Sequence, residues 1–253
     1  MSNIVTITKA DFTDKRWKKP DNYLFAVKDS ICPLTLQEMF KAVLSLPIGF
    51  IVRQEKATPV ALQGLKPQNN LLVAPDGRWL GRYIPATYRS YPFNLGVTED
   101  EVQLLCIDSD SGCISETEGH HFFTEDQPSQ ETGKMINFLT QLHQDRLKTD
   151  EICSVLYRHN LIQPWSITLK TGENETNVEG LYQIDENLLA QLDSTAFDEL
   201  RTVGSLPLVY SQLLSMQHLQ SLGQLASQQQ SKPSADMLDL EQLFGEKDAL
   251  IKF

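Results

Sequence analysis

The segment APDGRWLGRYIPATYRSYPF, residues 74–93, holds the residues of this chain that are best suited to recognition chemistry. Five aromatic residues fall within positions 79–93, although the whole chain is only 8% aromatic. Guanidinium groups and aromatic rings together form recognition surfaces, because they bring large contact area at a low entropy cost. Such a surface would bind an acidic or an aromatic group. The candidate binding residues are Arg78, Trp79, Arg82, Tyr83, Tyr88, Arg89 and Tyr91.

Two arrangements of this segment are compatible with its sequence. In the first, three rings are buried and the arginines cover them with their methylene stems. These three rings belong to Trp79, Tyr83 and Phe93. In the second, the arginines form an exposed patch together with Tyr88 and Tyr91, in a loop that Pro85 and Pro92 hold stiff. Only the second arrangement provides a binding surface.

Two adjacent histidines, His120 and His121, are the weak candidates for a metal site, with Glu125 and Asp126 close by in sequence. Adjacent side chains point apart on a strand and lie about 100° apart on a helix, so joint ligation requires a special loop. The sequence contains no H-x-x-x-H or H-E-x-x-H spacing. We therefore expect a structural loop here, without a metal, and no cofactor.

The common motifs of nucleophilic catalysis and phosphate binding are missing from the sequence. Four widely spaced cysteines form no C-x-x-C pair and are typical of small buried hydrophobic residues. There is no G-x-S-x-G, no P-loop and no G-x-G-x-x-G. A non-enzymatic protein is expected on this basis. The cysteines are Cys32, Cys106, Cys113 and Cys153.

Composition and charge limit the classes of partner. The chain has 253 residues and a formal net charge of −11, which argues against general affinity for nucleic acid or anionic membrane. No apolar run approaches the roughly 20 residues needed to span a bilayer. The beginning of the chain, MSNIVTITKADF, lacks a basic region followed by an apolar one, so a cytoplasmic location is expected.

The first half of the chain predicts mainly short strands, with one helix. Thr35 and Glu38 have the spacing of a capping box, and the helix that follows has an apolar pattern of Leu36, Met39, Phe40, Val43 and Leu44. Asp76-Gly77 is a hairpin signal. Closely spaced strands of this kind are typical of an antiparallel meander. The expected strands are 4–7, 23–27, 48–53, 60–65, 70–74, 78–84 and 102–108, with a return strand beginning at Cys113-Ile114.

The second half predicts mainly helices. Ser129 is expected to cap a helix that continues or restarts near Ile152, and a hairpin is expected around residues 171–174. Asp185 and Ser194 are expected to cap two short helices, and a longer helix starts near Ser205. The predicted fold class is therefore α+β: an antiparallel sheet region in the first half, packed by helices mainly from the second half, in a single main domain.

Four segments are distinguished along the chain. Residues 1–20 are expected to form an N-terminal arm anchored by Trp17, and 21–226 the α+β domain. The polar stretch 227–236 is expected to be a flexible linker. Residues 237–253 have the pattern of a short amphipathic helix, which would fold back on the core or dock on a partner.

From about Tyr23 to Leu222 the sequence resembles the SapC family of bacterial proteins. The most specific match is PVALQGLKPQNNLLVAPDGRWLGRYIPATYRSYPF, residues 59–93. It is supported by LLCIDSDSGCIS (104–115), NLIQPWSITL (160–169), GLYQIDENLLAQL (180–192) and LPLVYSQLLSMQHL (206–219). The resemblance implies an association with surface layers and peptide transport. It also implies neighbourhood with tryptophan-halogenase-like proteins, cupin-like proteins and TonB-dependent receptors.

Together, the residues and the resemblance predict a non-enzymatic cytoplasmic accessory protein that recognises a partner protein or peptide through the Arg/aromatic surface. Two alternatives stay open. One is an enzyme with an unrecognised site, assisted by a metal at His120 and His121. The other is a structural component of a surface layer. The sequence leaves the oligomeric state open.

Overall fold

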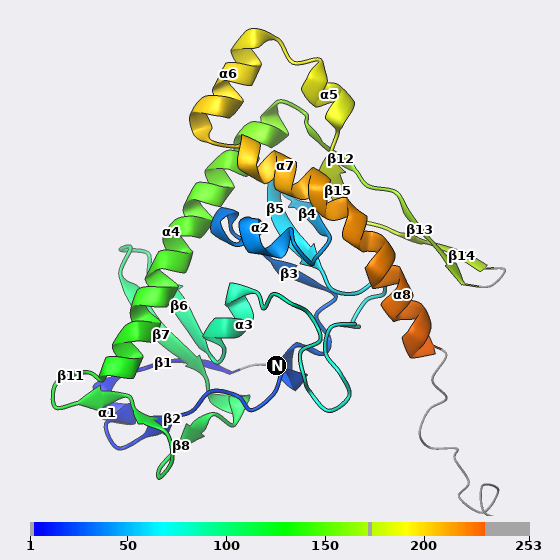
Figure 1. Cartoon of the computed structure of the whole chain (residues 1–253). Helices are drawn as coiled ribbons and strands as arrows, with labels where there is room; N and C mark the ends of the chain where they lie inside the picture. Colours follow the sequence, from blue (N-terminus) through cyan, green and yellow to red (C-terminus); the bar gives the residue numbers. More distant parts are fainter. Residues whose placement is uncertain (1–2, 172–173, 231–253) are drawn as a thin grey trace, which may run out of the picture.

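The computed structural model describes residues 3–171 and 174–230. As the sequence predicts, the fold is α+β in a single domain, with antiparallel sheets in the first half and helices mostly in the second. Figure 1 shows a long helix, α4, running beside two separate sheet regions.

The central sheet has five strands in the order β12-β15-β4-β5-β3. Its middle is the β4–β5 hairpin, in which Ile48 pairs with Ala61 and Val52 with Ala57. The two strands β12 and β15 come from far along the chain, and β15 joins β4 through a single residue pair, Tyr182 with Phe50. The sheet is therefore a hairpin extended by late strands, and not the meander that the sequence predicts. The strands are β3 (Ile31–Pro33), β4 (Ile48–Arg53), β5 (Lys56–Leu62), β12 (Ile162–Pro164) and β15 (Tyr182–Ile184).

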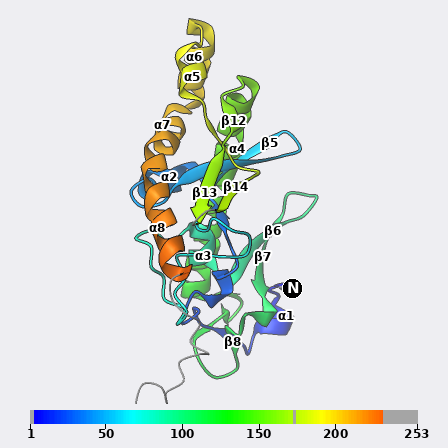
Figure 2. The same cartoon turned by 90° about the vertical axis from the view of Figure 1, so that its right-hand side faces the viewer.

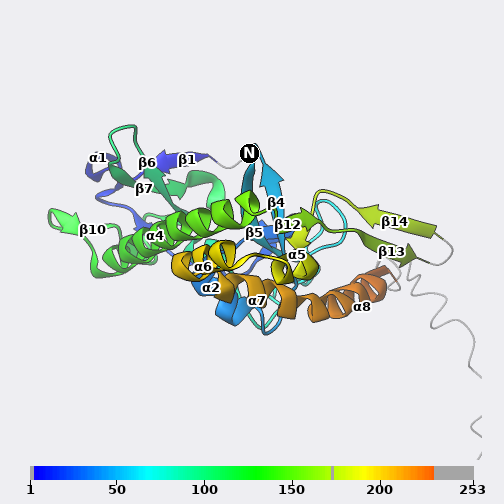
Figure 3. The same cartoon turned by 90° about the horizontal axis from the view of Figure 1, so that it is seen from above.

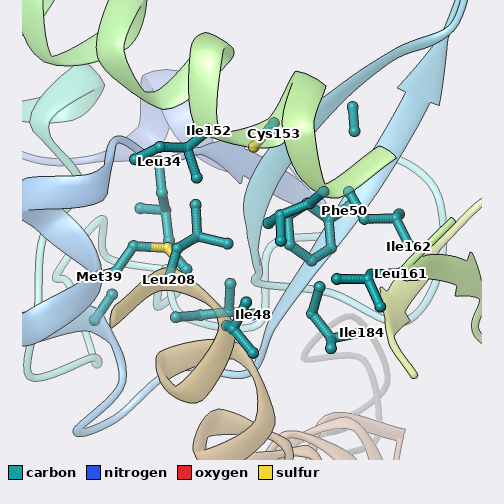
Figure 4. Close-up of a cluster of buried hydrophobic side chains, with 14 of the residues drawn as sticks. Leu34, Met39, Ile48, Phe50, Ile152, Cys153, Leu161, Ile162, Ile184 and Leu208 are labelled. Atoms are coloured by element: carbon teal, nitrogen blue, oxygen red, sulfur yellow. The ribbon is translucent and has the colours of Figure 1, made fainter. Parts of the chain in front are cut away.

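The two faces of the central sheet bury different residues because side chains alternate along a strand. Ile48 and Phe50 point into the largest core, together with helix residues such as Met39 and Leu208 (Figure 4). On the other face, Gly49 lets the Trp165 ring lie close to the strand, since an added Cβ would be only 3.1 Å from that ring.

A second sheet region lies at the other end of α4. One sheet has the order β1-β7-β6 and a small one the order β8-β2-β9. Trp17 anchors the second of these: it is 2% exposed, and its indole N–H donates to the hydroxyl of Thr132 at 3.0 Å. Within the predicted N-terminal arm, Ile4–Thr6 and Arg16–Trp17 thus contribute strands to these sheets. The elements are β1 (Ile4–Thr6), α1 (Lys9–Phe12), β2 (Arg16–Trp17), β6 (Phe93–Val97), β7 (Gln103–Asp108), η2 (Ser109–Ser111), β8 (Ile114–Ser115), β9 (His120–His121), β10 (Phe123–Thr124) and β11 (Gln127–Pro128).

Helix α4 (Gln130–Arg158) connects the two regions without a break. Ser129 caps it, as predicted, by accepting a hydrogen bond from the Thr132 N–H. Met135 and Leu139, near its start, pack in the core of the second sheet region. Ile152 and Leu156, near its end, pack in the core of the central sheet. One helix therefore contributes to both cores.

The C-terminal helices cover the end of the central sheet, on the same side as α2 (Figures 1 and 3). Gln212 of α7 lies where β4 and β15 diverge: its side chain accepts from the Ile184 N–H at 3.0 Å and donates to the Ile48 carbonyl at 3.2 Å. Ser215 accepts from the Ile48 N–H at 2.9 Å. These side chains replace the missing strand–strand bonds. The helices are α2 (Leu36–Ala42), α5 (Glu186–Ala190), α6 (Ser194–Val203), α7 (Leu206–Ser215), η3 (Met216–His218) and α8 (Leu219–Gln230).

Several local predictions are confirmed. Thr35 and Glu38 form the capping box of α2, Asp185 caps α5, and Pro207 lies in the first turn of α7. The predicted hairpin around 171–174 is formed by β13 (Ile167–Thr171) and β14 (Asn174–Val178), although residues 172–173 lie outside the described residues. All four cysteines are buried and free.

Other local predictions are wrong. Residues 23–27 form a 3₁₀ turn, η1 (Leu24–Ala26), because the Asn22 side chain accepts from the Leu24 N–H and turns the chain. The predicted strands 70–74 and 78–84 share only the bridge between Val73 and Trp79. The cap of α6 is Asp193, one residue before the predicted Ser194.

One predicted strand pairing and the predicted apolar face of α2 also differ from the structure. Ile114 begins a strand, but it pairs with Trp17 of β2 and not with the preceding strand β7. In α2, the buried side centres on Met39 and Ala42, whereas Phe40 and Leu44 are exposed. The predicted linker 227–236 begins inside α8, which ends at Gln230. The predicted tail, 237–253, lies outside the described residues.

Candidate functional site

The Arg/aromatic segment, residues 74–93, does not form one continuous surface. Its side chains lie on an exposed loop, in the core and in two separate pockets. Arg78 and Arg82 are exposed on the loop that follows the Asp76-Gly77 turn. Arg78 forms an ion pair with Asp76 at 2.6 Å, which holds the pKa of that carboxyl below its usual range through a side-chain hydrogen bond. The two arginines nearest the start of the segment are therefore on a surface loop.

Trp79 lies half-buried between aromatic neighbours. Its indole N–H donates to the Tyr83 carbonyl at 3.0 Å, and its ring centre is 5.6 Å from those of Tyr23 and Tyr88. It packs against two hydrophobic clusters. Trp79 thus has the structural role of the first arrangement that the sequence allows.

Tyr88 is buried, which contradicts the expectation of an exposed ring. It is 5% exposed, and its hydroxyl lies 2.8 Å from the Gln63 side-chain oxygen and 3.0 Å from the Asp29 carboxylate. Burial, followed by the nearby Cys32 and Asp29, raises the pKa of Tyr88, so the hydroxyl stays protonated. Tyr88 is part of the core beside α3 (Ala86–Ser90).

Tyr83 and Arg89 line a pocket of about 370 Å³ between α2, α3 and α4. The Arg89 guanidinium lies over the Phe138 ring at 5.1 Å and over the Tyr83 ring at 5.9 Å. Its Nε–H donates to the Ile84 carbonyl at 3.1 Å, and one terminal N–H donates to the Tyr83 hydroxyl at 3.4 Å. The remaining lining residues are Thr35, Gln37, Glu38, Phe40, Lys41, Ala86, Gln141, Leu142 and Asp145.

Glu38 forms the floor of this pocket. It is 5% exposed, and one carboxylate oxygen accepts from the Tyr83 hydroxyl at 3.0 Å and from the Ala86 N–H at 2.6 Å. The other oxygen accepts from the N–H and hydroxyl of Thr35, at 3.0 and 3.2 Å. One carboxylate thus caps α2 and holds the start of α3. Arg89, Tyr83 and Glu38 form a chain of hydrogen bonds across the pocket.

The electrostatics of the pocket favour binding by hydrogen bonds and stacking. Burial, followed by the charge of Glu38, raises the pKa of Tyr83, so its phenol stays a neutral donor to that carboxylate. The Arg89 guanidinium N–H groups that Ile84 and Tyr83 do not occupy have no hydrogen-bond partner among the described residues. Such donors suit a carboxylate, and the exposed Phe40 ring offers apolar contact area beside them.

Tyr91 does not line the Arg89 pocket and lies at a second pocket. Its ring stacks on Phe25 with centres 3.9 Å apart and an interplanar angle of 8°, at the edge of a second pocket of about 310 Å³. Lys18 and Lys19 also line this pocket, together with the buried Cys113. Tyr91 and Arg89 therefore line separate pockets, although they are two residues apart in sequence.

His120 and His121 are exposed on β9, where they pair with Trp17 and Arg16 of β2. The His120 ring lies 5.2 Å from the Trp17 ring. Within residues 3–171 and 174–230, no group of three or more His, Cys, Asp or Glu residues is arranged to hold a metal ion.

Sequence reasoning did not assign a site role to Phe138 or Glu38, the two residues that complete the pocket. The capping-box spacing identified Glu38 only as a helix cap, and Phe138 was one of several apolar positions of α4. No local signal connects either residue with Arg89, because the contacts join segments 45 or more residues apart. Tyr83 and Arg89 were predicted, and they are the two members of the segment that share this pocket.

The structure thus defines an α+β protein with a small Arg/aromatic pocket beside its longest helix. The sequence profile of the SapC family matches residues 7–222, so the chain belongs to the SapC family, as the resemblance predicted. No curated protein sequence and no solved structure matches the chain. Among the helices that the structure describes, none combines the length and the apolar character needed to cross a membrane.

Proposed function

We propose that this protein is a non-catalytic, cytoplasmic accessory protein that recognises a partner protein or peptide through the pocket of Arg89, Tyr83 and Phe138. The observation that carries the proposal is the position of the Arg89 guanidinium. It lies against two rings, and donors on it are left for a ligand at the opening of the pocket. A carboxylate that accepts hydrogen bonds from Arg89, next to an apolar or aromatic side chain packed on Phe40, fits this arrangement.

The pocket is preorganised, which supports a binding role. Three elements supply its wall, and the Glu38 carboxylate ties two of them together. Residues held in this way lose little conformational entropy when a ligand binds. The resemblance to the SapC family implies neighbourhood with tryptophan-halogenase-like proteins and TonB-dependent receptors, and we propose candidate partners from these systems.

The test compares two arginines of the same segment. The full chain, as wild type, Arg89→Ala and Arg78→Ala, is used as bait in quantitative affinity purification, with unfolding in urea as the folding control. A partner specific for the pocket is lost with Arg89→Ala and retained with Arg78→Ala, because Arg78 does not line the pocket. The interaction is then titrated with the purified partner, and its affinity should fall with added salt. Equal recovery with all three baits would contradict the proposal.

A further inference from the structure

The second pocket, of about 310 Å³, lies in the second sheet region and shares no lining residue with the Arg89 pocket. We call it the Lys19 pocket. Three segments far apart in sequence form it: residues 18–25 after β2, Tyr91 after α3, and residues 111–113 before β8. Figures 1 and 2 both show β8 at the opposite end of the molecule from α5 and α6. The volume suits a small molecule, because such sites begin at roughly 300 Å³.

Two adjacent lysines supply the positive charge of the Lys19 pocket. Lys18 has a loose ion pair with Glu118, with the two atoms 3.9 Å apart and both side chains exposed, so a ligand can displace it at little cost. Among the described residues, the Lys19 ammonium has no carboxylate within 4.0 Å. The nearby Glu131 is already paired with Lys134 at 2.6 Å. Ammonium groups of this kind bind phosphate as compact point charges.

The uncharged polar groups of the pocket are mainly hydrogen-bond donors. The Asn22 side-chain oxygen accepts from the Leu24 N–H at 3.0 Å, which leaves the amide N–H₂ group to donate. The Ser111 hydroxyl accepts from the Cys113 N–H at 3.2 Å, and its own hydrogen stays available. Burial raises the pKa of Tyr91, so its hydroxyl also stays protonated. Such a lining suits a ligand with several acceptor oxygens.

The negative charge near the pocket is mostly engaged or absent. Asp108 is 6% exposed, and its carboxylate accepts from the N–H groups of Asn3 and Asp110, at 3.2 and 3.1 Å. Burial raises the pKa of the Cys113 thiol, which keeps it neutral. The Asp21 carboxylate lines the pocket as an acceptor, and a ligand hydroxyl would satisfy it. The charges thus fit a ligand that has a phosphate at one end and a hydroxyl at the other.

The walls of the Lys19 pocket are held in place by the rest of the fold. Tyr91 is stacked on Phe25, and the Phe25 ring meets the buried Tyr88 ring edge-on, with centres 5.8 Å apart. The Lys18 N–H donates to the Cys113 carbonyl at 2.9 Å, which ties the first segment to the last. A ligand therefore meets a largely preformed site, and little conformational entropy is lost on binding.

We propose that the Lys19 pocket binds a small phosphate monoester that carries a hydroxyl group, with the phosphate on Lys18 and Lys19 and the hydroxyl on Asp21. This site goes beyond the proposed function, because none of the residues of the Arg89 pocket takes part in it.

Isothermal titration calorimetry of the full chain tests the proposal. The probes are glycerol 3-phosphate, inorganic phosphate and glycerol, at about pH 8, where the phosphates are dianions because their second pKa is near 6. The variants are Lys18→Ala and Lys19→Ala. Lys28→Ala is the matched control, since Lys28 is an exposed lysine of the neighbouring chain segment that does not line the pocket. Unfolding in urea confirms that each variant is folded.

Glycerol 3-phosphate should bind the wild type one to one, more tightly than inorganic phosphate, and glycerol should not bind. Each variant of the two pocket lysines should weaken the binding at least about tenfold, because a hydrogen bond to a charged group is lost. Lys28→Ala removes the same charge from the protein and should leave the affinity within about twofold of wild type.

Three results would overturn the proposal. The first is no binding of either phosphate at concentrations up to about 10 mM. The second is equal weakening in Lys19→Ala and Lys28→Ala, which would show only general attraction between charges. The third is a short phosphoserine peptide that binds at least about tenfold more tightly than glycerol 3-phosphate, which would assign the pocket to a phosphorylated protein. None of the three lysines lines the Arg89 pocket, so these results are independent of the test of the proposed function.

Discussion

Replacing Glu38 tests the construction of the pocket, because this carboxylate joins two elements that are far apart in sequence. In Glu38→Ala, the N–H groups of Thr35 and Ala86 lose their acceptor, and both residues are buried, at 3% and 2% exposure. A buried donor left without a partner costs about 1–3 kcal/mol. The Tyr83 hydroxyl is half-buried and can turn to water, so it adds little. The expected loss in the free energy of unfolding is therefore about 4 kcal/mol.

Glu38→Gln removes the charge of the side chain and keeps its shape. The amide keeps one oxygen acceptor and puts an N–H₂ group where the other oxygen was, so only one of the two backbone donors loses its partner. We expect a loss of about 2 kcal/mol, half of the effect of the alanine variant. Gln37→Ala is the control at the neighbouring exposed position, and surface changes of this kind stay within about 0.5 kcal/mol.

The assay is equilibrium unfolding in urea followed by tryptophan fluorescence. Trp79 is a local reporter, because its indole N–H bonds to the carbonyl of Tyr83, the residue whose hydroxyl bonds to Glu38. The change should appear in the midpoint, with an unchanged slope m. If Glu38→Ala lost less than about 1 kcal/mol at constant m, the buried donors would have found other partners, and the role of Glu38 as the acceptor that joins α2 to α3 would be refuted.

Two further predictions concern the cores. Gln212→Ala should lower the free energy of unfolding by about 2 kcal/mol in the same assay, since the Ile184 N–H loses its acceptor and the Ile48 carbonyl keeps only the Ser215 hydroxyl at 3.5 Å. The exposed Gln217→Ala should change little. Burial raises the pKa of the Cys153 thiol to about 12 from 9.0. Its stabilising contribution is therefore complete below pH 9 and is lost between about pH 9 and 12, because only the unfolded thiol ionises there. Relative to Cys153→Ala, wild type should lose about 2 kcal/mol between pH 8 and 10.5, and parallel pH profiles would contradict the burial argument.

The sequence could predict the elements whose signals are local. The capping box of α2 and the Asp185 cap of α5 depend on side chains that bond to backbone groups within three residues. The predicted strand 48–53 coincides with β4, whereas its partner was predicted at 60–65 and lies at Lys56–Leu62. In each case the interacting groups are neighbours in the chain, so their spacing carries the information.

Long-range pairing left no comparable signal. The pairing of β15 with β4 joins Tyr182 to Phe50, and α4 separates the two strands in sequence. The strands predicted at 70–74 and 78–84 failed for a related reason. The Asn70 side chain accepts from the Leu72 N–H and donates to the Gln63 side chain, which holds the loop without a ladder. Such side-chain bonds compete with strand formation, and no periodicity reveals them.

The Arg/aromatic segment shows why composition predicts a binding surface only in part. Successive residues of a helix point about 100° apart, so even the five residues of α3 cannot all face one ligand. Tyr88 points into the core and Arg89 points outward, and Tyr91, beyond the helix, meets the other pocket. A second element must then supply the rest of the surface.

That second element is α4, and its contribution decides what Arg89 can do. An exposed arginine on a five-residue helix samples many rotamers, and ordering it on binding is costly in entropy. Phe138 lies under the guanidinium, and the Ile84 carbonyl and Tyr83 hydroxyl fix its edge. Phe138→Ala should therefore weaken partner binding about as much as Arg89→Ala, without removing any hydrogen-bond donor. Because Phe138 itself offers a partner no charge, this equality would show that the ring acts by holding the guanidinium in place.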